Sequence, residues 1–357
     1  MQDVATSAKS GNDTIDDAFS KSEWFTRGWT LQELLAEGVK VFCNSSWHVI
    51  GHIFRGNKRS TRWWKAARPV RTEPLGAVWL GPTFPEERPG RYIYYREDLS
   101  QAVSQITSVD LTYLNGSVAL DEASVACRFS WAASRETTRE EDQAYCLLGL
   151  FGVNMPLLYG EGSKAFLRLQ QEIIKVSCDE SIFAWTAERD RWNGDSTEHG
   201  IMAKNLRHFK NSAHVCRTGL RPDRPYSITN IGLEMNVKRY KLDLKDRRYV
   251  DDLCEPYLIP LISITTYTQS KVSMSLPGKP AFLVLLDCLH DRQHVYYRSR
   301  CTDYLMRAGR QHKSELPLRG NSMHQIFVPL IAEAAFHCEK CQKFDARLEI
   351  ALQFWDR

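Results

Sequence analysis

The sequence predicts an α+β protein in which a helical middle region precedes a β-rich C-terminal module. Apolar residues recur at three- and four-residue spacings up to about residue 186, and short β-type runs separated by Gly, Pro, Asp and Asn follow beyond about residue 225. The 357 residues are 43% hydrophobic and 25% charged, as in an ordinary globular protein. This length allows one large domain or two to three smaller ones.

Residues 1–21 are predicted to be a disordered leader, since they are rich in Ser, Asp, Thr and Gly and poor in large apolar groups. After Ser22, the spacing of apolar residues and a closing glycine describe an amphipathic helix on Trp24, Gly28, Leu31, Leu35 and Gly38. Alternatively, Thr30 and Glu33 form a capping box that restarts or shortens this helix. Residues 39–42 are then predicted to form a short strand.

Residues 52–96 are predicted to be an insertion of low order, because periodicity is lost and five prolines interrupt the segment. The region also holds seven basic residues with no acid between them, namely Arg55, Lys58, Arg59, Arg62, Lys65, Arg68 and Arg71. Interleaved with Trp63 and Trp64, this run could bind nucleic acid. A solvated insertion is the favoured interpretation, so nucleic acid is not an expected partner; translated intron sequence is a further open interpretation.

Helical patterning returns over residues 97–108 and 121–133 and defines a helical region over residues 97–186. Thr138 and Glu141 have the spacing of a capping box, which predicts a helix over residues 139–150. Ser163 is expected to cap the next helix, whose apolar face consists of Phe166, Leu169 and Ile173.

Residues 187–357 are predicted to form the β-rich module, sandwich-like or barrel-like in architecture. It opens on a polar loop, and its predicted strands cover residues 226–228, 233–237, 257–267, 272–276, 282–288, 294–297, 325–328 and 350–354.

The ten cysteines are scattered and lie mostly in apolar stretches, which favours reduced, buried thiols over disulfides. No run approaches the roughly 18 to 20 apolar residues of a membrane helix, and the N-terminal segment lacks the basic-then-apolar pattern of a secretory signal. We therefore expect no membrane span and a cytoplasmic location.

Two segments carry a family resemblance. The first is Trp24-Phe25-Thr26-Arg27-Gly28-Trp29-Thr30-Leu31-Gln32-Glu33. The second joins Ser130-Trp131-Ala132-Ala133, Thr137-Thr138-Arg139, Glu141-Asp142, Tyr145-Cys146-Leu147-Leu148-Gly149, Pro156-Leu157-Leu158-Tyr159-Gly160-Glu161-Gly162 and Ser181-Ile182-Phe183-Ala184-Trp185. Together they resemble fungal heterokaryon-incompatibility (HET) proteins. The resemblance implies a role in non-self recognition, vegetative incompatibility and linked programmed cell death.

The resemblance also assigns the motif residues, which are Trp24, Arg27, Gly28, Trp29, Gln32, Glu33, Trp131, Thr138, Arg139, Glu141, Asp142, Tyr145, Pro156, Tyr159, Gly160, Glu161 and Gly162. The HET domain is usually recognised by three blocks, of which the last matches the segment around Arg27. Residues 1–22 match neither of the earlier two. Residues 22–51 are therefore expected to be the C-terminal remnant of a HET domain truncated at its N-terminus.

The HET domain is thought to be related to the TIR domain, a doubly wound α/β module, and some TIR domains cleave NAD with a glutamate on a helix. The resemblance thus implies a partial TIR-like remnant that is inactive alone, with NAD as a possible substrate of a full-length relative. Two alternatives stay open: an NAD-cleaving effector enzyme, if the upstream blocks are encoded, and a nonenzymatic module that binds a protein partner or a second copy.

Three local patterns are candidate sites. Arg27 and Glu33 could contact a phosphate and a ribose hydroxyl, or could simply hold the fold. The glycines at 160 and 162 resemble a phosphate loop, but a tight turn between packed helices is the favoured interpretation. Cys338 and Cys341 supply half of a zinc site, and no second pair stands at useful spacing, so neither metal nor cofactor is expected.

Overall fold

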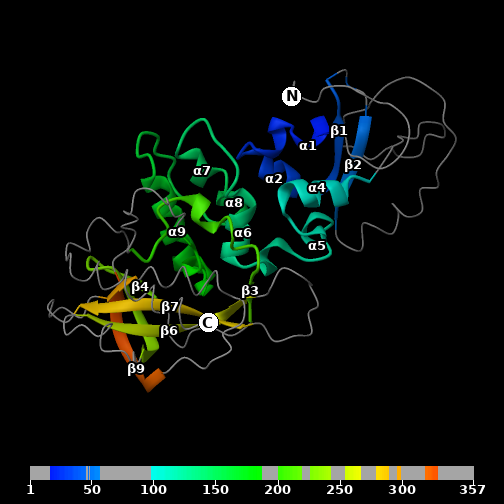
Figure 1. Ribbon diagram of the computed structural model, residues 1–357. Coiled ribbons are helices and arrows are strands. Elements are labelled where there is room, and N and C mark those ends of the chain that lie inside the picture. Colours follow the sequence, from blue (N-terminus) through cyan, green and yellow to red (C-terminus); the bar gives the residue numbers. More distant parts are fainter. Residues whose placement is uncertain are drawn as a thin grey trace. The chain divides into compact units, whose positions relative to one another are not determined.

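The computed structural model describes residues 17–45, 47, 49–56, 98–186, 200–218, 226–242, 254–266, 279–288, 296–298 and 318–328. The chain divides into two compact units, residues 1–120 and residues 121–357 (Figure 1). The first combines short helices with an antiparallel hairpin, and the second combines helices with a larger antiparallel sheet. The predicted mixed α+β class is thereby confirmed.

The first unit begins with an aromatic cluster. Its opening elements are α1 (Asp17–Ser20), η1 (Glu23–Phe25) and α2 (Thr30–Leu35). The Phe19 ring lies edge to face with those of Phe25 and Phe42, at centroid distances of 5.1 and 5.4 Å, and is 2% exposed. Burial of this ring gives residues 17–20 a fixed place in the core, so the predicted leader is wrong for these four positions. Residues 1–16 lie outside the described part.

The predicted helix over Trp24 to Leu35 is shorter in the structure. The Thr30 hydroxyl lies 2.5 Å from the Trp24 carbonyl oxygen and 2.8 Å from that of Arg27, which closes a turn ahead of α2. This confirms the alternative in which the helix restarts at Thr30. The capping box itself is not formed, because the Glu33 carboxylate accepts from the Trp24 indole (3.4 Å).

The hairpin pairs β1 (Gly38–Cys43) with β2 (Val49–Arg55), so the predicted strand at 39–42 is confirmed. Because β2 continues to Arg55, residues 52–55 are strand rather than insertion. The Arg55 side chain is buried and its Nε donates to the Tyr113 carbonyl (3.1 Å), which removes it from the solvated basic run. Residues 57–97, including the other six cations of that run, lie outside the described part.

The unit is completed by α4 (Ser100–Thr107) and α5 (Leu111–Leu114), which pack on β2. The Leu99 amide donates to the His52 carbonyl (2.8 Å). The predicted helix over 97–108 is therefore present, but α4 and α5 lie with the hairpin rather than with the helical middle region. That residues 22–51 are a TIR-like remnant of a HET domain stays a prediction.

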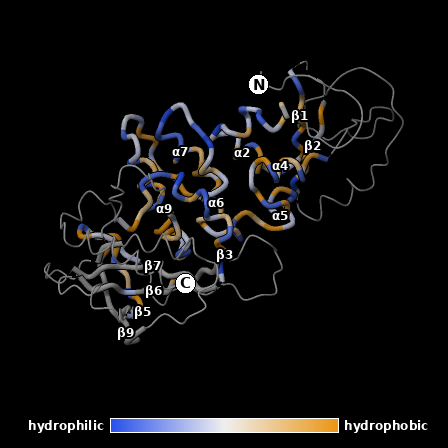
Figure 2. The backbone as a smooth tube through the Cα atoms, viewed as in Figure 1, coloured by the Kyte–Doolittle hydropathy of each residue, from blue (hydrophilic) through white to orange (hydrophobic). Residues whose placement is uncertain are grey.

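The second unit starts with a helical region. Its elements are η2 (Leu120–Glu122), which begins at the unit boundary, α6 (Val125–Ala132), α7 (Asp142–Tyr145), α8 (Leu148–Phe151), α9 (Lys164–Val176), η3 (Glu180–Phe183) and η4 (Leu206–Phe209). Phe129 lies at the core, with its ring centroid 4.6, 5.4 and 4.7 Å from those of Phe151, Phe166 and Phe209. Figure 2 shows hydrophobic and hydrophilic residues mixed along this region, and α9 is amphipathic because its apolar residues gather on the buried face.

The single helix predicted over residues 139–150 is wrong, because the chain forms α7, a turn and α8. Tyr145, Cys146 and Leu147 are all at least 99% buried. Three consecutive buried side chains do not fit one face of a straight helix, so the break at Cys146 and Leu147 lets all three enter the core. By contrast α9 buries Phe166, Leu169 and Ile173 as predicted, although Ser163 makes no side-chain cap.

The second unit ends in a seven-stranded antiparallel sheet. Its strands are β3 (Val215–Arg217), β4 (Ser227–Ile228), β5 (Leu233–Leu242), β6 (Cys254–Thr266), β7 (Lys279–Cys288), β8 (Tyr296–Arg298) and β9 (Leu318–Val328). The order is β4-β5-β6-β7-β8, with β9 paired to β5 and β3 to β6. Six of these strands overlap predicted runs and β3 was not predicted; the runs at 272–276 and 350–354 lie outside the described residues.

Candidate functional site: an anchored loop and a helix junction

The first motif segment is mostly a folding element. The Trp24 ring packs against Phe25 and Phe42 in the aromatic cluster, and Gly28 is buried in the turn before α2. Gln32 is half-buried, whereas Trp29 is 45% exposed. Arg27 and Glu33 are both exposed, and the Glu33 carboxylate is engaged by the Trp24 indole. These contacts account for Trp24, Gly28 and Glu33 through the fold.

The second motif segment builds what we call the anchored loop, residues 156–162. Its backbone is fixed by a carboxylate: Oε1 of Glu141 accepts from the amides of Gly160 (2.6 Å) and Gly162 (3.0 Å). The capping role predicted for Glu141 is therefore wrong, because this side chain serves the loop instead. Both glycines have positive φ, +99° and +60°, which lets the backbone turn its amides toward one oxygen.

A tyrosine and an arginine fasten the other parts of the loop. The buried Tyr145 hydroxyl donates to Oε1 of Glu161 (2.9 Å) and accepts from the Leu158 amide (2.7 Å). Arg168 of α9 lies 3.2 Å from the same Glu161 oxygen and donates to the Pro156 carbonyl. The loop is thus bonded to α7 at one side and to α9 at the other.

Tyr159 is held more loosely on the surface. Its hydroxyl donates to Oδ1 of Asp142 (3.0 Å), and the Arg139 guanidinium lies 4.5 Å from its ring centroid, at cation–π distance. The Tyr145 and Tyr159 rings meet edge to face at 5.5 Å. Nine motif residues are therefore brought together in space, namely Arg139, Glu141, Asp142, Tyr145, Pro156, Tyr159, Gly160, Glu161 and Gly162. Thr138 is exposed beside them in the chain, and Trp131 is buried in the α6 core.

These contacts shift the pKa values of the ionisable groups in and around the loop. The Glu141 carboxyl accepts from the backbone N–H groups of Glu141 itself, Gly162 and Gly160, and these bonds hold its pKa below the ordinary value. Burial and the bond to Glu161 raise the pKa of the Tyr145 hydroxyl. The bond to Asp142 does the same for Tyr159. At neutral pH the Glu141 carboxyl is thus ionised, and the Tyr145 and Tyr159 hydroxyls are neutral. In this state Glu141 can accept from the loop amides and both tyrosines can donate.

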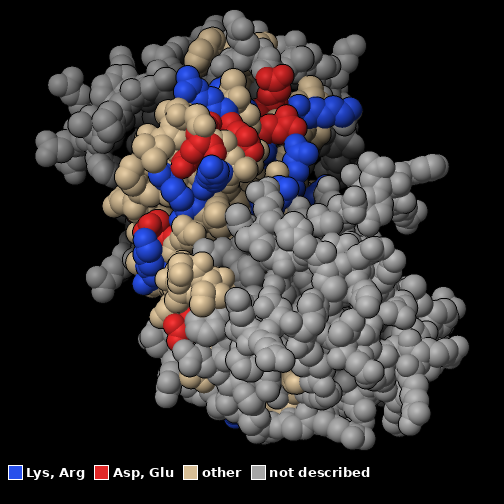
Figure 3. All heavy atoms as spheres, turned by 90° about the vertical axis from the view of Figure 1, so that its left-hand side faces the viewer, with Lys and Arg blue, Asp and Glu red and all other residues tan. Residues whose placement is uncertain are grey.

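Although its backbone is bonded down, the loop turns apolar side chains outward. Leu157, Leu158 and Tyr159 are 53%, 51% and 49% exposed. Charged side chains of both signs are interspersed with uncharged ones on the described surface that Figure 3 displays. Sequence reasoning treated this segment only as a turn. The available signal was a run of three large apolar residues between a proline and a glycine, which no helical face absorbs.

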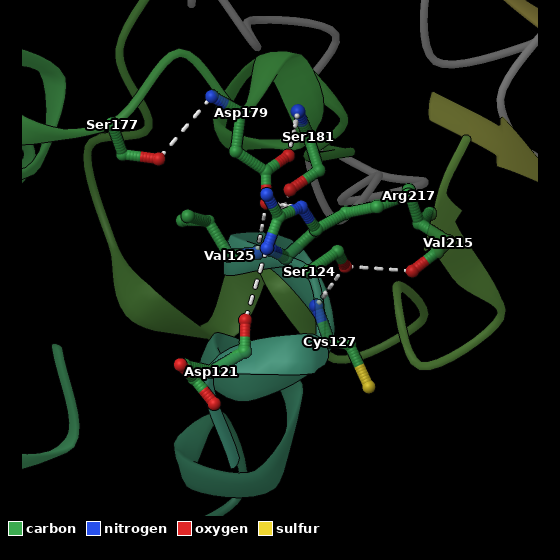
Figure 4. Close-up of polar contacts among 10 residues, drawn as sticks. Asp121, Ser124, Val125, Cys127, Ser177, Asp179, Ser181, Val215 and Arg217 are labelled. Atoms are coloured by element: carbon green, nitrogen blue, oxygen red, sulfur yellow. Dashed lines mark hydrogen bonds and ion pairs between the residues drawn. The ribbon is translucent and has the colours of Figure 1, made fainter. Parts of the chain in front are cut away.

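A second feature, separate from the loop, is a polar junction around the first turn of α6 (Figure 4). Oδ2 of Asp179 accepts from the Val125 amide (2.9 Å), Ser181 Oγ from the Ala126 amide (3.0 Å), and Ser124 Oγ from the Cys127 amide (3.0 Å). All three amides are thereby capped by side chains, which stabilises the helix. The first two caps come from residues more than fifty positions away, a pairing that no local pattern predicts.

Among the described residues, no group of three or more His, Cys, Asp or Glu side chains is placed to hold a metal ion. Cys338 and Cys341 lie outside them. Within the same ranges, no helix combines the length and the apolar character needed to cross a membrane. Five cysteines are free thiols, namely Cys43, Cys127, Cys146, Cys178 and Cys216, and of these five Cys127 and Cys146 are buried.

Comparison with known proteins gives one informative relationship. The chain is 33% identical over 178 residues to the vegetative incompatibility protein HET-E-1 of Podospora anserina. The match covers 49% of this chain and 10% of that protein, so the chain spans about a tenth of its relative. No family model and no solved structure matches. About half of the chain is therefore related to a fungal vegetative incompatibility protein.

Proposed function

We propose that this chain takes part in fungal vegetative incompatibility and the linked programmed cell death, and that it acts in the cytoplasm by binding a protein. The relationship to a vegetative incompatibility protein supports the process. The anchored loop supports the mode of action, and the observation that carries it is the half-exposure of Leu157, Leu158 and Tyr159 on a bonded backbone.

The physical argument rests on preorganisation. A flexible loop loses conformational entropy when it binds, whereas a loop already fixed by Glu141, Tyr145 and Arg168 loses little. Exposed leucines and a tyrosine gain free energy when a partner removes them from water, and such clusters mark interaction sites. The partner's contact area is therefore expected to centre on these three side chains.

The test replaces Leu157 and Leu158 together by serine. We expect expression of the wild-type chain in a fungal host to arrest growth and kill cells, and the double variant to lose this effect. Because both side chains are half-exposed, the free energy of unfolding should change by no more than roughly 0.5 kcal/mol per site.

Val176→Ser is the matched control, since Val176 is an apolar residue of α9 that is 71% exposed and lies outside the loop. This variant should kill as the wild type does. A double variant that kills at the wild-type rate, at equal protein level, contradicts binding through the loop. Sedimentation of the purified wild-type chain then measures its oligomeric state. An oligomer indicates binding to a second copy, and a monomer indicates a different protein partner.

As part of the same proposal, we expect the chain to have no NAD-cleaving activity. The glutamate of that alternative, Glu33, accepts from the Trp24 indole, and Arg27 lies exposed in the turn before α2. The measurement is release of nicotinamide from NAD by the purified chain. Hydrolysis that disappears in Glu33→Gln would establish the enzymatic alternative.

A further inference from the structure

The junction around α6 joins two structural layers of the second unit. From the helical side, Asp179 and Ser181 cap the first turn of α6. From the same short segment, Glu180 accepts from the hydroxyl of Tyr226 (2.8 Å), the residue that precedes β4, and the Phe183 and Tyr226 rings meet at 5.6 Å. Neighbouring side chains of η3 thus point alternately to the helices and toward the sheet.

The strand β3 approaches the same helix end from the sheet. It pairs with β6 through only three positions, Val215 with Thr266, Cys216 with Thr265 and Arg217 with Ile264. The Ser124 hydroxyl donates to the Val215 carbonyl (2.6 Å), so a single serine contacts both the α6 backbone and β3. Figure 4 shows Ser124 between Val215 and Cys127.

Arg217 closes this arrangement across the helix end. Its Nη1 donates to the Asp121 carbonyl (3.0 Å), and its Nε lies 3.9 Å from Oδ2 of Asp179. The two partners differ in burial, because the Asp179 side chain is 2% exposed and that of Arg217 is 43% exposed. The Asp179 carboxylate also accepts from the backbone amides of Val125 and Ser181. Loss of Arg217 would therefore leave the buried carboxylate hydrogen-bonded.

We propose that Arg217 is a latch, which fastens β3 and its edge of the sheet to the N-terminal end of α6 and can open while the helices stay folded. The inference rests on the difference in burial between Asp179 and Arg217. The helix caps are buried and independent of Arg217, and the Ser124–Val215 bond at the start of β3 is buried as well. The Arg217 contacts at the end of β3 are instead partly in water, and the ion pair with Asp179 is weakened by salt. With the latch open, β3 is held by the Ser124 bond and by its three-position pairing with β6, so the edge of β6 over residues 264–266 is exposed more often.

The experiment is hydrogen exchange on the full chain, with Arg217→Ala compared to the wild type. We expect amide exchange in residues 215–217 and 264–266 to rise about tenfold, as for loss of one hydrogen bond from a charged group. The amides of Val125, Ala126 and Cys127 should keep their wild-type rates, since their acceptors are intact. Salt at 1 M should reproduce part of the rise in the wild type and none in the variant.

Arg207→Ala is the matched control, because Arg207 is 59% exposed and also lies 3.9 Å from a carboxylate, that of the exposed Glu136. It should leave β3 exchange unchanged. Three outcomes would overturn the latch: unchanged exchange in β3, an equal rise in β3 and α6, or failure of Arg217→Ala to fold. Arg217→Lys provides a second variant, which keeps the charge and should open β3 less than alanine does.

Discussion

At the scale of single residues, the two tyrosines of the anchored loop offer a matched comparison. Tyr145→Phe removes a buried hydroxyl that both donates to Glu161 and accepts from the Leu158 amide, which leaves that amide unpaired. We expect it to cost about 1–2 kcal/mol of unfolding free energy. Tyr159→Phe removes a surface bond to Asp142 and should cost no more than roughly 0.5 kcal/mol. Urea unfolding of both variants measures the difference, and equal losses would contradict the assigned anchoring role.

Glu141 makes the folding stability depend on pH in a direction that follows from its pKa shift. The folded state lowers the pKa of this carboxyl, so its ionisation adds stability above the unfolded pKa of about 4.3. This contribution is lost as the pH falls through the lower, folded pKa. Glu141→Gln should therefore be less stable than wild type at pH 7, with the gap narrowing below about pH 4. Unfolding titrations at several pH values test this, and a gap that stays constant from pH 7 to pH 3 would count against it.

The residues of the site were only partly predictable. The spacing of Thr138 and Glu141 allows a local capping box, yet Glu141 bonds to amides about twenty positions away. Both bonding modes satisfy the carboxylate, and only the folded arrangement of α7 against the loop decides between them. Family resemblance selected Glu141, Tyr145 and Glu161 as a set. The resemblance could not reveal that these side chains fix one loop, residues 156–162.

At the scale of elements, prediction worked where the pattern of burial follows one period. The helix α9 was predicted because its apolar residues recur along one face. Strands β6 and β7 were predicted from apolar runs bounded by turn residues, and β5 from the alternation of apolar and polar residues over 233–237. It failed for α7 and α8, where three successive residues are buried. It also missed β3, whose three residues are held by the Ser124 hydroxyl, by the contacts of Arg217 and by pairing with β6.

The turn of the anchored loop depends on glycine at one position in particular. Gly160 has φ +99°, a conformation that L-residues rarely adopt, although a Cβ added there would meet no atom within 4 Å. We expect Gly160→Ala to cost about 1–3 kcal/mol through backbone strain alone. Gly152→Asn is the control, because φ +64° at this C-cap suits asparagine and space is also open there. Thermal unfolding measures both, and an alanine at 160 that is as stable as wild type refutes the strain.

At the scale of the whole molecule, the boundary between the units lies later than the sequence indicates. Sequence patterning places α4 and α5 at the start of the helical middle region, because they resume helical periodicity after residue 96. The structure places them in the first unit, where Leu99 bonds to His52 and Arg55 reaches Tyr113. Contacts across the undescribed stretch between β2 and α4, rather than local propensity, determine this membership.

This boundary predicts how fragments behave. A fragment of residues 121–357 retains the core around Phe129 and the sheet, so it should unfold cooperatively by heat. A fragment of residues 97–357 adds α4 and α5 without their partners in β2, so it should be no more stable, and protease should remove residues 98–114 first. Calorimetry and limited proteolysis measure both properties. If only the longer fragment folds, α4 and α5 belong with the second unit and the boundary at residue 120 is wrong.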